Sequence, residues 1–226
     1  CGMYGQVPAA HSSVGLSETD VVIYVTSGTS ASCTGSTMGF AAACVQDAGS
    51  GRPIAGYLHL CPDTLIDAGS DIFERERFFS AVAHEVMHAL GFNQNTFTSN
   101  PQGNMLSTFT ERGHTVTKIT TPTALATVRA HFDCVALNGV ELEDGGSAGF
   151  SLSHLEERVF HGELMAGELC ATGICPMSAI TMAIMEDLGW YEANYDAAEM
   201  LPWLRQAGCT AVTDRCDMAG HPAPFC

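Results

Sequence analysis

The chain contains 226 residues, of which 46% are hydrophobic and 15% are charged, a balance typical of a globular protein with a sizeable core. Nine Lys and Arg residues against 25 Asp and Glu residues give a formal net charge of −16. Such a surface repels phosphate backbones and anionic lipid headgroups, so we expect no nucleic-acid partner. The sequence contains no run of about 18 uncharged apolar residues, so it predicts no transmembrane segment.

The ten cysteines are spread from Cys1 to Cys226 and are not gathered in tight pairs. An even number with this distribution favours a disulfide framework, made in an oxidising compartment, over a thiolate metal cluster. Ten free thiols in a cytosolic protein are the weaker alternative. We therefore expect an extracellular or cell-surface location, reached through the secretory pathway.

Residues 1–62 carry three runs of strand-forming residues, separated by clusters of Gly, Ser, Thr and Pro. These runs are Val21–Val25, Gly39–Val45 and Ile54–Leu60. From Asp71 the apolar period changes to that of a helix, which Gly91 ends. The apolar stripe of this helix is predicted to consist of Ile72, Phe79, Val82, Val86 and Leu90.

The remainder of the chain predicts loops and helices. Residues 93–121 are rich in Asn, Thr, Ser and Gly and predict irregular surface structure. Thr121 and Pro122 predict the cap and the first residue of a helix that runs toward Cys134. Another helix is expected over about 177–188. Strands first and helices later indicate an α+β fold.

His84, Glu85 and His88 form the pattern HExxH within the predicted helix. Residues four apart lie on one helix face, so both imidazoles point at one metal ion, with positions left for a third ligand and a water. Zinc lowers the pKa of that water, and Glu85 is placed to take its proton as it attacks a peptide carbonyl. A chance pattern of surface residues is the alternative. Gly91 argues against this alternative, because it extends the motif to HExxHxxG.

The third ligand is open at this point. The short metzincin pattern would place a histidine where this chain has Gln94. The alternatives are histidines further along the chain, or glutamates on a thermolysin-like plan. They are His114, His131, His154, His161, Glu111, Glu141 and Glu143. Spacing alone does not choose among them.

The segments 153–158 and Glu163–Met165 resemble those that carry the third histidine and the methionine turn in the leishmanolysin family of metzincins, which includes the invadolysins. The resemblance covers most of positions 1–216, including Arg52–Tyr57, Val128–Cys134, Gly139–Asp144 and Met182–Tyr191. It implies that His154 joins His84 and His88 as a ligand of one Zn2+ ion. It also implies that Met165 lies beneath the histidines as the Met-turn residue.

The resemblance implies a two-lobed, metzincin-type zincin fold. Residues 1–92 would form the upper catalytic lobe, a twisted sheet with the active-site helix at about 71–91. Residues 93–226 would form the family insertion and a helical or irregular, disulfide-bonded lower lobe that carries the third ligand. The implied activity is endoproteolysis of polypeptide substrates, bound as an extra strand along a sheet edge. The alternative is a catalytically silent adhesion or binding module at the cell surface, against which the intact Glu85 argues.

Cysteine positions similar to those of the family suggest the disulfides Cys1–Cys44 and Cys134–Cys209. Proximity and elimination alone suggest the pairs Cys33–Cys61, Cys170–Cys175 and Cys216–Cys226. Compared with the family pattern, the chain begins after the first strand and its backing helix. It stops near the start of a cysteine-rich C-terminal domain, so we expect further domains in a larger precursor.

Overall fold

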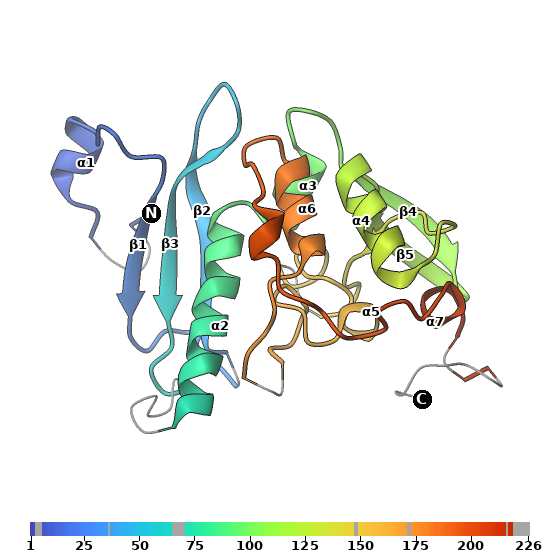
Figure 1. Cartoon of the computed structure of the whole chain (residues 1–226). Helices are drawn as coiled ribbons and strands as arrows, with labels where there is room; N and C mark the ends of the chain where they lie inside the picture. The colour runs from blue at the N-terminus through green and yellow to red at the C-terminus, as the bar shows by residue number, and fades with distance from the viewer. Residues whose placement is uncertain are drawn as a thin grey trace. The chain divides into compact units, whose positions relative to one another are not determined.

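The computed structural model describes residues 1–2, 6–35, 37–64, 71–146, 149–170, 173–215 and 217–218 (Figure 1). The chain divides into two units, Cys1–Phe92 and Asn93–Cys226, and a three-stranded sheet lies in each. The structure is therefore of mixed α/β type. Among the helices of the described residues, none combines the length and the apolar character needed to cross a lipid bilayer.

The sheet of the first unit is built from the three predicted runs. β1 (Val22–Ser27), β2 (Gly39–Gln46) and β3 (Pro53–Leu60) lie in the order β1-β3-β2 (Figure 1). β1 is parallel to β3 and β2 is antiparallel to it. A short helix, α1 (Ala9–Ser13), precedes the sheet. Because the strand order is β1-β3-β2, β2 forms one edge of the sheet.

Helix α2 (Ile72–Ala89) packs against β2 and β3 (Figure 1). It begins at Asp71, whose side chain accepts a hydrogen bond from the N–H of Phe73 at 2.9 Å, as a helix cap should. It lies close to the sheet at Gly56, where an added β-carbon would be 3.1 Å from the β-carbon of Ala89. Glycine at this position thus permits the close approach.

The predicted apolar stripe of α2 is wrong in its first half. Phe79 is 57% exposed and Ile72 is 71% exposed. The buried residues of the helix are instead Ser80, Ala81, His84 and Ala89. Small residues occupy most of the buried positions, as at Ala89 beside Gly56 of the sheet, so large apolar residues at helical spacing do not by themselves identify the face that packs.

The second unit contains a sheet that the sequence did not predict. β4 (Leu106–Glu111), β5 (His114–Ile119) and β6 (Val140–Glu141) are antiparallel, in the order β4-β5-β6. The prediction of irregular structure over 93–121 is therefore wrong, as is the simple order of strands before helices. β4 combines Leu106 and Phe109 with two threonines, residue types that suit a half-buried strand. A two-residue turn at Arg112–Gly113, with φ of 51° and 90°, closes the hairpin.

Two helices of the second unit, those that begin at Pro122 and Ala179, begin at or within two residues of the predicted positions, whereas the sequence did not predict the other four elements. The helical elements among the described residues of this unit are α3 (Gln94–Thr98), α4 (Pro122–Phe132), α5 (Glu157–Phe160), α6 (Ala179–Asp187), the 3-10 helix η1 (Tyr195–Ala197) and α7 (Thr210–Thr213). α4 packs against α6. Asp187, at the end of α6, accepts hydrogen bonds from the N–H groups of Thr123 and Ala124 in the first turn of α4. The carboxylate thereby caps α4 and ties the two helices together.

Disulfides within the described residues cross-link each unit separately. They join Cys1 to Cys44, Cys33 to Cys61, Cys134 to Cys209 and Cys170 to Cys175. These are four of the predicted pairs, and the fifth, Cys216–Cys226, lies outside the described residues. Each closed loop restricts the unfolded chain and so stabilises the unit that contains it.

A buried ionic network holds the second sheet together. Lys118 on β5 is only 1% exposed. Its Nζ lies 2.6 Å from Glu111 Oε2, 3.0 Å from Asn138 Oδ1 and 3.8 Å from Glu141 Oε2. Arg112, in the hairpin turn, also pairs with Glu111 and with Glu141. The two cations therefore compensate two carboxylates that would be costly to bury alone.

Lys118→Met tests this network, because methionine keeps an unbranched apolar side chain and removes the charge. We expect the free energy of unfolding to fall by about 3 kcal/mol, since two carboxylates would then share one buried cation. Denaturant unfolding measures the change. The control Arg75→Met alters an exposed cation on α2 and should change stability by less than about 0.5 kcal/mol. A Lys118→Met protein as stable as the wild type would contradict the prediction.

The stability of this sheet should also depend on pH through Glu111. Burial by itself raises the pKa of Glu111, but hydrogen bonds from Lys118 and Asn138 and the charges of Lys118 and Arg112 outweigh it, so the pKa lies below its ordinary value of 4.5. The folded state favours the ionised carboxylate, so this contribution is complete above pH 4.5 and is lost as the pH falls through the folded-state pKa. The stability difference between wild type and Glu111→Gln, measured by urea unfolding, should therefore be larger at about pH 7 than at about pH 3. Equal differences at the two pH values would show that Glu111 does not act through its charge.

Candidate metal centre

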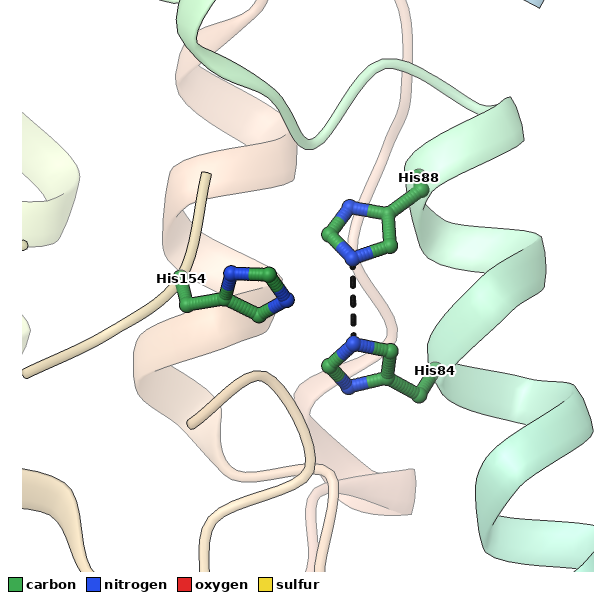
Figure 2. Close-up of side chains that lie close together, drawn as sticks. All are labelled: His84, His88 and His154. Atoms are coloured by element: carbon green, nitrogen blue, oxygen red, sulfur yellow. Dashed lines mark hydrogen bonds between the residues drawn. The ribbon is translucent and has the colours of Figure 1, made fainter. Parts of the chain in front are cut away.

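His84 and His88 lie one turn apart on the same face of α2. Their Nε2 atoms are 3.0 Å apart, the contact marked by the dashed line in Figure 2. Two ligands of a tetrahedral zinc ion, each with a Zn–N distance of about 2.05 Å, have nitrogen atoms about 3.3 Å apart. The pair therefore fits two ligands of one ion after a small adjustment.

A backbone carbonyl orients the ring of His88. Its Nδ1 lies 2.7 Å from the carbonyl oxygen of Phe92. A carbonyl can only accept a hydrogen bond, so Nδ1 carries the hydrogen and the neutral ring has its lone pair on Nε2. Gly91, with φ of 116°, makes the turn that brings Phe92 back to the helix, where its N–H donates to the carbonyl of Met87. The glycine of HExxHxxG thus has a structural purpose beside the histidine pair.

His154 is held in the same way within the second unit. It is 7% exposed, and its Nδ1 lies 2.9 Å from the carbonyl oxygen of Phe150. The ring of Phe150 lies beside the imidazole, with the ring centroids 4.4 Å apart. Burial lowers the pKa of His154, against the raising effects of the Phe150 carbonyl and of the charge on Glu143. The hydrogen bond again assigns the lone pair to Nε2.

The three imidazoles form a group that fits a metal ion. Each of His84, His88 and His154 offers one ring nitrogen, and these atoms lie within 4.8 Å of one another (Figure 2). Imidazole nitrogens are common ligands of zinc. Three protein ligands leave the fourth position of a tetrahedral ion for water, which distinguishes catalytic from structural zinc sites.

Glu85 follows His84 on α2 and faces β2. Burial raises the pKa of Glu85 to about 7, against a lowering effect from the backbone N–H of Ala41 on β2. Its Cγ lies 3.5 Å from the point that a β-carbon on Gly39 would occupy. Small residues on β2 therefore leave room for this carboxylate.

The other candidate histidines have different partners. His114 is half exposed, and its Nε2 lies 3.8 Å from Asp144. The Nε2 of His131 lies 3.0 Å from the carbonyl oxygen of Trp203, and burial lowers the pKa of this ring. His161 contacts the carboxylate of Glu157 and the ring of Trp203.

The glutamates of the thermolysin-like alternative are also engaged elsewhere. Glu111 and Glu141 belong to the ionic network around Lys118. Glu143 accepts hydrogen bonds from the N–H groups of Gly145 and Glu157, at 2.9 and 3.5 Å. Glu143 also lies in an acidic cluster with Asp144 and Glu156. Acidic residues gather without a metal in many proteins, so the cluster indicates no ion by itself.

Met165 is completely buried, and its backbone is fixed on both sides. Its N–H donates to Glu163 Oε2 at 2.5 Å, and its carbonyl accepts from the N–H of Leu155 at 2.8 Å. The position of Glu163, an acidic residue beside the apolar Leu164 and Met165, is the only mark of these contacts in the sequence. The carbonyls of Phe92 and Phe150 cannot be identified from the sequence, because every residue has a backbone carbonyl.

Comparisons with known proteins relate the whole chain to one family. The family model described as leishmanolysin matches residues 1–226. The leishmanolysin-like peptidase of Drosophila melanogaster is 33% identical over 240 residues, which cover 89% of this chain and 34% of that protein. Leishmanolysin of Leishmania donovani is 35% identical over 229 residues, which cover 100% of this chain and 37% of that protein.

The leishmanolysin homolog of Crithidia fasciculata is 32% identical over 229 residues, which cover 100% of this chain and 33% of that protein. The chain thus spans about a third of the length of these curated relatives. Its mixed α/β structure with small sheets and disulfides is consistent with the fold of those proteins. Because the match runs from the first residue to the last and three separate relatives agree with it, the chain belongs to the leishmanolysin family.

Proposed function

We propose that this chain is the catalytic region of a zinc-dependent endopeptidase in which His84, His88 and His154 bind one zinc ion. The observation that carries the proposal is the convergence of three ring nitrogens within 4.8 Å of one another. Two of the rings have Nδ1 held by a backbone carbonyl, the arrangement expected of histidine ligands. Bound zinc would supply a Lewis acid and lower the pKa of an attacking water.

Glu85 is the proposed general base. It takes a proton from the water as the oxygen attacks the peptide carbonyl, and it passes that proton to the amine nitrogen as the C–N bond breaks. Its position on α2, directly after His84, supports this role. The small residues Gly39 and Ala41 on β2 leave room for the carboxylate beside the strand.

We further propose the two-lobed metzincin layout, with Met165 as the Met-turn residue and polypeptides as substrates. β2 forms an edge of its sheet, and Glu85 faces this strand. An extended substrate pairing with β2 would therefore run past the proposed base, and main-chain pairing tolerates varied sequences. The disulfides support an extracellular or cell-surface location. The silent adhesion module is not favoured, because it has no need for Glu85.

The proposed base can be tested with Glu85→Gln, which keeps the shape of the side chain and removes its ability to accept a proton. We expect kcat/KM on an unfolded, fluorescently labelled protein to fall by at least about 100-fold, with the bound zinc unchanged. Glu76→Gln, on the same helix, should retain wild-type activity. Cleavage at the wild-type rate by Glu85→Gln would exclude Glu85 as the base.

The third ligand can be tested by measuring zinc affinity against a competing chelator. His154→Ala should weaken binding by at least about 100-fold, because one of three protein ligands is lost. His114→Ala should bind zinc as the wild type does. Glu141→Gln tests the thermolysin-like alternative, which predicts loss of zinc in this variant and retention in His154→Ala. That result would replace the proposed ligand set.

A further inference from the structure

Glu163 is a buried carboxylate that the proposed reaction does not use. It is 0% exposed, and burial raises its pKa. Among the described residues its partners are neutral donors: two backbone N–H groups and two hydroxyls. Hydrogen bonds of this kind favour the ionised form and offset the cost of burying it. A fully buried carboxyl group that accepts from four donors has a role that a simple apolar residue would not fill.

The two oxygens of Glu163 bridge two separate segments. Oε1 accepts from the N–H and the Oγ of Ser178, at 3.0 and 2.8 Å, and from the Oγ1 of Thr181 at 2.7 Å. Ser178 is the N-cap of α6 and Thr181 lies in its first turn. Oε2 accepts from the N–H of Met165. The carboxylate therefore ties the segment at Met165 to the N-terminal end of α6.

The connection continues from Met165 to His154. The carbonyl of Met165 accepts from the N–H of Leu155, which is 0% exposed and forms a parallel bridge with Ala166. On the other side, the N–H of Glu143 donates to the carbonyl of His154 at 2.9 Å. The backbone at His154 and Leu155 is therefore held by hydrogen bonds to Glu143 and to Met165. Met165 in turn donates its N–H to Glu163.

We propose that Glu163 is a positioning residue for the metal centre, which holds the backbone beside His154 at the geometry that zinc binding requires. The inference rests on the proposed role of His154 as a ligand. Only acceptors are suitable at both ends of the bridge, because Met165 and α6 both present donors. Glutamine would place an NH2 group against one of them, and aspartate is too short to reach both. Groups that orient ligands from outside the coordination sphere commonly change metal affinity by about 10- to 100-fold.

The test compares Glu163→Gln with Thr181→Val in the full-length protein. Thr181→Val removes one hydroxyl from the same carboxylate but leaves the contact with Met165, so it is a matched control for lost stability. Zinc affinity by chelator competition, the visible absorption of the Co2+-substituted protein and the free energy of unfolding are measured for each. We expect Glu163→Gln to bind zinc about 10- to 100-fold more weakly and to alter the Co2+ spectrum. Thr181→Val should lose stability yet keep the wild-type affinity and spectrum.

Wild-type zinc affinity and Co2+ spectrum in folded Glu163→Gln would overturn the inference, as would affinity losses in both variants that simply follow stability. If Glu163→Gln does not fold, Glu163→Asp replaces it, with the same expectation and the same overturning result. His154→Ala is measured in the same series. If it loses zinc while the Glu163 variant does not, the positioning role is wrong and the proposed function stands. If His154→Ala keeps wild-type affinity, the ligand assignment fails and the inference fails with it.

Discussion

The candidate metal centre depends on hydrogen bonds that two backbone carbonyls accept from histidine rings. Phe92 and Phe150 each hold the Nδ1 of one imidazole, His88 and His154 respectively, so that the lone pair of each ring is on Nε2. A carbonyl cannot donate a hydrogen bond, so the Nδ1 atom that contacts it must carry the hydrogen. The position of the carbonyl is set by the backbone rather than by a side-chain rotamer, which fixes the orientation of the ring. The turn at Gly91 is thus as much a part of the candidate metal centre as the imidazoles.

Three buried or partly buried glutamates differ in the groups that their carboxylates contact, and we assign them different roles for that reason. Glu141 pairs with cations in the core of the second sheet, and its charge contributes to structure. Glu163 meets only neutral donors among the described residues, and we assign it a positioning role. For Glu85, burial raises the pKa to about 7 against the lowering effect of the Ala41 backbone N–H, and we propose that this carboxylate exchanges a proton. Burial alone would not distinguish the three.

Local patterns predicted the elements whose conformation depends on nearby residues. The three strands of the first unit, the cap at Asp71, the proline at the start of α4 and the turn at Gly91 follow from backbone preferences that act over a few residues. Composition misled over 93–121, because Thr and Ser suit both loops and half-exposed strands, and pairing decides between them. The predicted stripe on α2 was wrong because small residues occupy most of the buried positions of this helix, and large apolar residues at helical spacing do not identify them.

The sequence by itself determined that His84 and His88 share a helix face, because residues four apart on a helix always do. It also placed the chain in its family, through segments that resemble other members along most of its length. Only the tertiary structure shows that Glu111 and Glu141 are committed to Lys118, and the role of His154 as third ligand stays a proposal. The physical reason is that a contact between separate elements, such as that of Lys118 with Glu141, depends on the packing of everything between them, whereas one helical turn depends on backbone geometry alone.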